Sequence, residues 1–276
     1  MCVTSSSNDY IVNGLQSSIN VRFTTLANRF ELRSNVDSDF DIAYRDYFQQ
    51  LNFAGRWNIK DKVAITADIP FAFNLRKEQN NSTFMTGLGD ISIGVVGQLP
   101  TITHNNSKHR VFLGFSFVAP TGEYKRATDT TGFSPIILPG TGMWVFSPSA
   151  EYIVSVKDYS IAAGLNYRYA LANADKLQMG GRTISWARFA YSKKIKTDRY
   201  IPSVSAVYEW LQQNKFKYQD VSLSGGHLFS LEAALDIKIK EKWGFSCRYR
   251  QPVYQYLSKN YLKQYGTASV QFNHFF

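Results

Sequence analysis

The sequence alternates between apolar and polar positions with a period of two along almost its whole length. Residues 159–171 illustrate the pattern, because apolar and aromatic side chains occupy the odd positions and Ser, Ala, Gly, Asn and Arg occupy the even ones. Successive side chains of a β-strand point to opposite faces, whereas an α-helix would show a repeat of 3.6 residues. The pattern therefore predicts an all-β protein.

Twelve segments show this alternation: 15–27, 43–59, 63–75, 86–99, 109–119, 142–156, 159–171, 182–195, 200–212, 222–239, 243–256 and 265–276. Most exceed the usual strand length of about 5–6 residues in globular proteins. They are long enough for a tilted membrane-spanning strand of about 9–11 residues. We therefore predict a transmembrane antiparallel up-and-down β-barrel over residues 15–276, preceded by a flexible tail at 1–14. About 12 strands are expected, with 10 or 14 left open because the first hairpin is the least regular.

The connections between these segments alternate in length. Short charged turns at 60–62, 157–158, 196–198 and 240–242, with a longer polar one at 101–108, form one set. The other set is longer and rich in Gly, Asn, Thr and Ser: 28–42, 76–85, 120–141, 172–181, 213–221 and 257–264. Outer-membrane barrels have short periplasmic turns and longer extracellular loops. The alternation predicts an even-stranded barrel of this kind, with both chain ends on the periplasmic side.

Composition narrows the class of protein further. Aromatic residues make up 15% of the chain, which excludes a disordered protein. Two cysteines are too few for a disulfide scaffold, and no stretch approaches the roughly 18 apolar residues of a membrane helix. The mean hydropathy of −0.25 is explained if a lipid-facing side is averaged with a wet interior. Twelve strands enclose more space than side chains alone fill, so we predict that the apolar face contacts lipid.

Tyrosines and tryptophans gather near the ends of the predicted strands, where amphipathic rings suit the membrane–water interface. We expect the following residues there: Tyr44, Tyr47, Trp57, Trp144, Tyr159, Tyr169, Trp186, Tyr208, Trp210, Trp243, Tyr249, Tyr254, Tyr256 and Tyr265.

The two ends of the chain carry separate signals. Val270, Phe272 and the final Phe276 share a face and resemble the C-terminal signal strand of bacterial outer-membrane proteins. The resemblance implies recognition by the barrel-assembly machinery, although His274 on the same face departs from the pattern and is expected at the interface. At the other end no secretory signal is visible, and we presume that a leader has been removed. Cys2 is then either a lipidated first residue or an incidental cysteine in the tail.

Three glycine-rich motifs point to a family. They are Gly87-Leu88-Gly89-Asp90-Ile91, then Ala119-Pro120-Thr121-Gly122-Glu123-Tyr124, then Pro139-Gly140-Thr141-Gly142-Met143-Trp144 with Pro148 after it. In this order they resemble outer-membrane barrels known as transporters of the meta-pathway of phenol degradation. The resemblance implies a monomeric barrel that passes small, often hydrophobic or aromatic compounds, and it names no catalytic residue. The long 120–141 loop between the last two motifs is either a constriction over the mouth or an ordinary surface loop.

Charged residues with inward parity are the candidates for lining the lumen: Arg22, Arg56, Asp68, Asp90, Glu151, Arg168, Arg188, Glu209, Glu232, Arg248 and Arg250. Charges on a lumen wall set ion selectivity, and an arginine excess in a chain with a net charge of +10 would favour anions. The alternative is a structural network, because arginines and carboxylates in a closed lumen pair with each other. Lysines in the turns and loops would instead meet anionic headgroups.

Two functions remain open. The first is an outer-membrane channel for passive passage of small hydrophobic, aromatic or anionic solutes. The second is a non-conducting barrel that anchors other envelope proteins. We do not expect an enzyme, a cofactor or a metal site: His227 and Ser230 are three residues apart and lie on opposite faces, and no phosphate loop or nucleophile elbow occurs. The basic charge is too dispersed for nucleic acid, so the expected partners are outer-membrane lipids and a small solute.

Overall fold

A computed structural model describes residues 15–32, 42–78, 81–124, 138–221, 224–257 and 262–276. The strands are β1 (Ser18–Leu32), β2 (Ile42–Lys60), β3 (Val63–Lys77), β4 (Ser82–Leu88), β5 (Ser92–Gln98), β6 (Ile102–His104), β7 (Ser107–Val118), β8 (Val145–Val156), β9 (Tyr159–Ala170), β10 (Leu177–Gln178), β11 (Arg182–Tyr191), β12 (Lys193–Ile195), β13 (Asp198–Leu211), β14 (Lys215–Phe216), β15 (Gln219–Asp220), β16 (Gly226–Ile239), β17 (Trp243–Leu257) and β18 (Leu262–Phe275). Within these ranges no helix is long and apolar enough to cross a membrane. Cys2 and the predicted tail lie outside the described residues.

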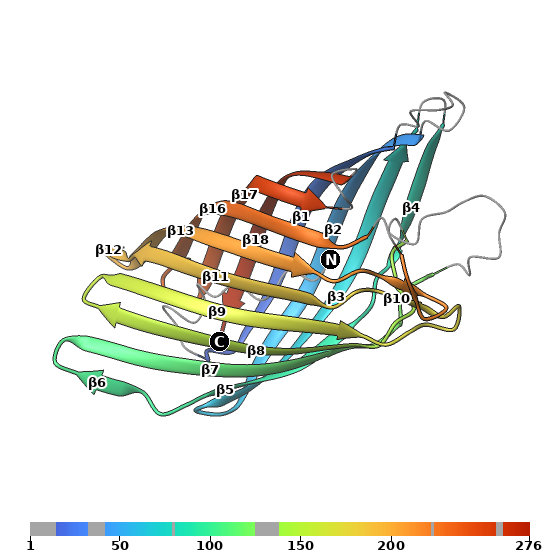
Figure 1. The fold of residues 1–276 in the computed structure, drawn as a ribbon. Coiled ribbons are helices and arrows are strands. Elements are labelled where there is room, and N and C mark those ends of the chain that lie inside the picture. Colours follow the sequence, from blue (N-terminus) through green and yellow to red (C-terminus); the bar gives the residue numbers. More distant parts are fainter. Residues whose placement is uncertain (1–14, 33–41, 79–80, 125–137, 222–223, 258–261) are drawn as a thin grey trace.

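The strands close into a twelve-stranded antiparallel barrel, as predicted (Figure 1). Neighbours in sequence are neighbours in the wall, and β1 pairs with β18 to complete the circle. The short strands do not add to the twelve. β4 and β5 are two parts of one wall strand that both pair with β3, β6 and β12 extend turns, and β10, β14 and β15 form a small separate sheet. The twelve wall strands thus form a closed ring, as a membrane requires of a β-protein, whereas β4 pairs only with β3 among the described residues.

The two ends of the barrel differ as the loop lengths predict. The Phe276 amide donates a hydrogen bond to the carbonyl of Ser17 at 3.2 Å, so the start of the first strand and the end of the last one meet at the end with the short turns. Lys240 and Glu241 form one such turn with positive φ angles of 47° and 59°, the conformation that tight hairpins favour. We call this the periplasmic end and the opposite one the extracellular end, following the asymmetry of outer-membrane barrels.

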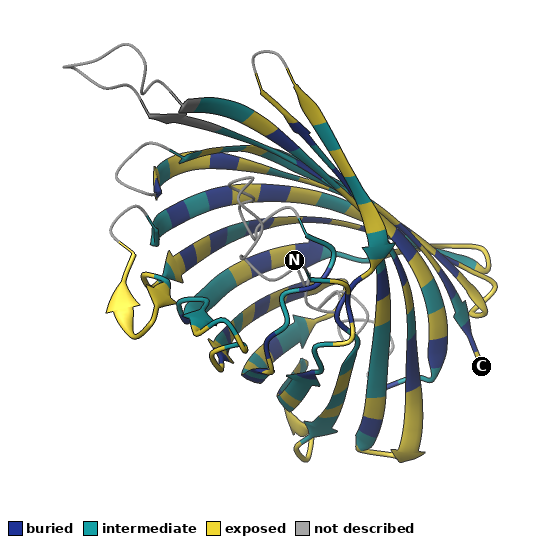
Figure 2. Cartoon of the chain, turned by 90° about the vertical axis from the view of Figure 1, so that its right-hand side faces the viewer, coloured by how far each residue is buried: buried dark blue, intermediate teal, exposed yellow. Residues whose placement is uncertain are grey.

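The outer wall is a belt of apolar side chains. Ile161, Leu165 and Val204 are at least half exposed. Ala162 and Asn166, which directly follow Ile161 and Leu165 in the chain, point inward and are buried. Figure 2 shows this alternation as bands along every long strand. So large an apolar surface is unstable in water, so it faces lipid. The interfacial positions of two aromatics were predicted wrongly. The Tyr44 ring lies 3.8 Å from the inward-facing Arg76 guanidinium, and Trp186 lines the interior.

Candidate functional site: the charged lumen

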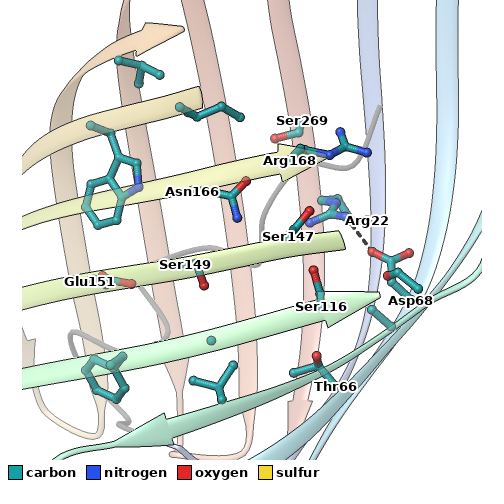
Figure 3. Close-up of a pocket in the computed structure, with 18 of the residues that line it drawn as sticks. Arg22, Thr66, Asp68, Ser116, Ser147, Ser149, Glu151, Asn166, Arg168 and Ser269 are labelled. Atoms are coloured by element: carbon teal, nitrogen blue, oxygen red, sulfur yellow. Dashed lines mark hydrogen bonds and ion pairs between the residues drawn. The ribbon is translucent and has the colours of Figure 1, made fainter. Parts of the chain in front are cut away.

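The interior of the barrel contains a cavity of about 250 Å³. Figure 3 shows Arg22, Asp68, Glu151 and Arg168 pointing into it from four different strands. Ten of the eleven charged residues proposed from parity line this cavity: Arg22, Arg56, Asp68, Glu151, Arg168, Arg188, Glu209, Glu232, Arg248 and Arg250. Strand parity alone therefore brings these groups to one space, and their role in selectivity stays a prediction.

Paired charges form a ladder along the wall made by β11, β13, β16 and β17. Glu232 accepts hydrogen bonds from Arg250 at 2.8 Å and from Arg188 at 3.3 Å. Glu209 accepts from Arg250 at 3.2 Å and also from Arg182, and its side chain is only 1% exposed. Arg250 therefore bridges two carboxylates on neighbouring strands, and the alternating charges neutralise one another across the sheet.

Two further groups extend this ladder. Arg248 lies 3.3 Å from Asp236, whose carboxylate also accepts a hydrogen bond from Ser246. Arg22 on the β1 wall pairs with Asp68 at 3.0 Å, and Asn52 donates to the other oxygen of that carboxylate at 2.7 Å. Ser116, Ser147, Ser149 and Asn166 supply neutral polar groups from β7, β8 and β9 (Figure 3). The lumen thus has one charged wall and one hydroxyl- and amide-rich wall.

Arg168 differs from the other arginines of the cavity. It forms no ion pair or hydrogen bond with any described residue and remains partly exposed. It lies near the extracellular end of β9, directly opposite Arg182 of the ladder in the strand register. Seven arginines and four carboxylates line the cavity, which leaves an excess of three positive charges. The residues that line the cavity are therefore net positive.

An apolar layer lines part of the inner wall toward the periplasmic end. Phe112, Ile153 and Ile201 are at most 2% exposed although they face inward, and Trp186 packs against their cluster. Leu15, which precedes the first strand, joins the same cluster and is 5% exposed. Gln16 follows Leu15, and its side chain accepts a hydrogen bond from Lys238 at 3.2 Å. The segment before β1 is therefore held inside the periplasmic mouth.

The three glycine-rich motifs meet at one point of the structure. The Asp90 carboxylate accepts hydrogen bonds from the Gly122 amide at 3.0 Å, the Thr141 amide at 2.8 Å and the Thr141 hydroxyl at 2.6 Å. A Cβ on Gly122 would lie 2.7 Å from the Gly140 Cα, so only glycine permits the approach. We call these contacts the clasp. They join both ends of the 120–141 loop to the break between β4 and β5.

Asp90 is consequently not a lumen-lining residue. The chain switches parity at the break, because Phe84 and Leu88 face outward before it and Ile93 and Val95 face outward after it. The sequence prediction treated 86–99 as one uninterrupted strand, and the alternation then placed Asp90 in the lumen. In the structure its carboxylate instead accepts the hydrogen bonds of the clasp. Residues 125–137 of the loop lie outside the described part of the chain, so the choice between constriction and surface loop stays open.

A serine, a histidine and a tyrosine are linked by hydrogen bonds on the outer wall near the periplasmic end. His109 lies between the Ser107 hydroxyl at 2.9 Å and the Tyr152 hydroxyl at 2.7 Å. The Ser107 hydroxyl donates its proton to the carbonyl of His104 at 2.7 Å. Together these hydrogen bonds tie the turn between β6 and β7 to β8. No group of three His, Cys, Asp or Glu residues suited to a metal occurs in the described ranges.

Several lumen residues escaped the sequence interpretation. Arg182 lies an even number of residues from Arg188 on the same predicted strand, and Asp236 an even number from Glu232. The alternation therefore places both Arg182 and Asp236 on the lumen face, and it was sufficient to find them. Trp186 also has this inward parity, but its residue type suggested the interface. The buried ion pair between Arg76 and Asp46 at 2.7 Å lies at the extracellular end, beyond the predicted strand of Arg76.

The closed barrel, its apolar outer belt and its charged lumen define the class of outer-membrane β-barrel proteins. The chain belongs to the family described as "Putative MetA-pathway of phenol degradation", whose model matches residues 7–256. Among solved structures it is similar to the COG4313 outer membrane channel from Pseudomonas putida F1, with 12% identity, a TM-score of 0.72 and coverage of 99% of this chain and 100% of that one. The β domain of the Bordetella autotransporter BrkA shares 8% identity with a TM-score of 0.50, covering 95% of this chain and 100% of that domain. No curated protein matches the sequence.

Proposed function

We propose that the protein is a passive channel for small organic anions. The observation that carries this proposal is the charge imbalance of the cavity, where seven arginines face four carboxylates and Arg168 has no partner among the described residues. A wall with excess fixed positive charge attracts anions and repels cations of the same size. The family's description and the fold of an outer-membrane channel support passage of a small solute.

The size and the second wall of the cavity support a small organic solute. A volume of about 250 Å³ suits a molecule smaller than the occupants of drug-sized pockets, which are about 300–1,000 Å³. Trp186, Phe112 and Ile184 line the same cavity and offer apolar contacts beside the arginines. An aromatic carboxylate would satisfy both surfaces, because the Arg188 guanidinium lies 5.4 Å from the centre of the Trp186 ring.

Reversal potentials in a planar bilayer under a salt gradient test the anion preference. We expect the protein to prefer chloride over potassium and Arg168→Glu to lower or reverse this preference, since it cuts the excess from three positive charges to one. Lys62→Glu makes the same charge change in an exposed periplasmic turn and should leave the reversal potential unchanged. Equal reversal potentials for the protein and for Arg168→Glu would refute the proposal.

Organic solutes need a second measurement. Proteoliposomes should swell faster in sodium benzoate than in benzyltrimethylammonium chloride, which presents a similar ring with the opposite charge. Arg168→Glu should narrow the difference. Equal swelling rates for the two solutes would contradict an anion-selective path for aromatic molecules.

A second candidate function is a non-conducting structural barrel. The paired ladder and the apolar layer around Leu15 support it, because ion pairs that neutralise one another and apolar side chains on the inner wall both oppose ion flow. Bilayer recordings separate the two candidates. Correctly folded protein without any conductance steps, retained with other envelope proteins on native purification, would support the structural role and exclude the channel.

A further inference from the structure

Four cationic residues lie side by side on the outer wall at the extracellular end. In the strand register Lys263 pairs with Arg29, Arg29 with Arg45, and Arg45 with Lys77. They occupy four neighbouring strands, β18, β1, β2 and β3, so the row is about 14 Å wide for strands about 4.8 Å apart. We call these four residues the cation row.

The cation row faces away from the lumen. Arg45, Lys77 and Lys263 are exposed, whereas the residues that alternate with them, such as Asp46 and Arg76, are buried inside. The row is therefore on the side of the barrel that meets lipid. Because it lies at the extracellular end, it stands at the headgroup level of the outer leaflet.

Direct cross-strand pairing of like charges is destabilising in a sheet. The pair of Arg45 and Lys77 carries this repulsion, and neither Arg45 nor Lys263 forms an ion pair with any residue in the described ranges. Lys77 contacts the Tyr47 ring at 5.8 Å from its centroid. An external anion that bridges the row would remove the repulsion.

An apolar groove begins directly beneath the cation row. Its cavity of about 320 Å³ is lined by Tyr47, Gln49, Phe73, Leu75, Lys77 and Phe84. The register places Tyr47 opposite Leu75 and Gln49 opposite Phe73, one and two outward positions below the pair of Arg45 and Lys77. Phe84 on β4 lies opposite Leu75 and is 61% exposed. The groove therefore runs over the outward faces of β2, β3 and β4, which lie next to one another in the wall (Figure 1).

Cations above an apolar groove match a molecule with phosphates at one end and acyl chains at the other. We propose that the cation row and the groove bind a phosphorylated glycolipid of the outer leaflet, with its phosphates on the row and an acyl chain along Phe73 and Phe84. Arginine and lysine near a membrane surface each strengthen binding of anionic lipid. This site is separate from the lumen and does not depend on the solute proposed above.

Native mass spectrometry of the detergent-purified protein tests the proposal, with bisphosphorylated lipid A as the probe and dephosphorylated lipid A as its control. Arg45→Gln with Lys77→Gln should weaken binding of the phosphorylated probe about 30-fold, and added salt should weaken wild-type binding. Lys215→Gln with Lys217→Gln removes the same charge from the extracellular side outside the row and should leave affinity unchanged. Heat-modifiable gel mobility and single-channel conductance should match wild type in both variants, which shows that folding and the lumen are intact.

The groove has its own test. Phe73→Ser with Phe84→Ser should weaken binding of bisphosphorylated lipid A while the affinity for inorganic pyrophosphate stays the same, since that probe has no acyl chain. Equal affinity for phosphorylated and dephosphorylated lipid A would overturn the proposal. Equal affinity of the cation-row variant and its lysine control would overturn it as well.

Discussion

Replacing Glu209 by glutamine tests whether the charged ladder holds the barrel together. The Glu209 carboxylate is 1% exposed and accepts hydrogen bonds from Arg182 and Arg250. Glutamine keeps the shape and removes the charge, so one or both guanidinium groups lose a charged partner. Hydrogen bonds to charged groups contribute about 1.5–3 kcal/mol each, and removing one partner of a buried ion pair costs about 3–5 kcal/mol. We expect Glu209→Gln to lower the free energy of unfolding by about 3–5 kcal/mol.

Reversible urea unfolding in lipid vesicles, followed by gel mobility, measures this loss. Glu241→Gln is the matched control, because Glu241 pairs with Lys238 at 2.6 Å but is 60% exposed, and an exposed pair contributes about 0–1 kcal/mol. Arg250→Gln and the double variant complete a cycle that isolates the coupling of Glu209 with Arg250. If Glu209→Gln loses no more than Glu241→Gln, the ladder is not structural and its charges are free to act in selectivity.

Four further predictions address the clasp, the wall, the mouth and assembly. Asp90→Ala removes three hydrogen bonds, so hydrogen exchange at the two amides that bind Asp90 should become faster, and unchanged exchange would contradict the clasp. Leu165→Arg should cost about 2–4 kcal/mol in vesicles because it places a charge in lipid, whereas Asn166→Arg on the lumen side should cost less; equal costs would argue against the assigned faces. Leu15→Ser should raise single-channel conductance by weakening the apolar layer, and no change would show that this layer does not limit flow. Deleting Phe276 should slow assembly into the outer membrane, scored by the heat-modifiable fraction in pulse-chase experiments, and normal kinetics would exclude it as a signal.

The faces and order of the strands are readable from sequence because both depend on local chemistry. Alternation at Leu165 and Asn166 assigns one side to lipid and the other to the lumen, since adjacent strand residues point in opposite directions. Turn lengths then imply antiparallel neighbours, and the even strand number follows. Parity brought Arg250 and Glu232 to the same face for the same reason.

The errors arise where a local rule is interrupted or overridden. Alternation fails to place Asp90 because the chain between β4 and β5 has one residue more than the facing stretch of β3. This extra residue exchanges the inward and outward positions, and only the pairing of β4 and β5 with β3 reveals it. Residue type fails for Trp186, because an inward tryptophan has space over Gly164 on the neighbouring strand, a contact that only the register creates.

The sequence alone is enough to establish a lipid-facing barrel of about 12 strands with a polar, arginine-rich interior, because a period of two is a property of each strand by itself. Only the tertiary structure decides which charges neutralise one another and which one, Arg168, has no described partner. It also decides that three separate glycine-rich motifs form one clasp and that four cations on four strands form one row. These features join residues far apart in the chain, and their distances depend on register and closure, which no single strand contains.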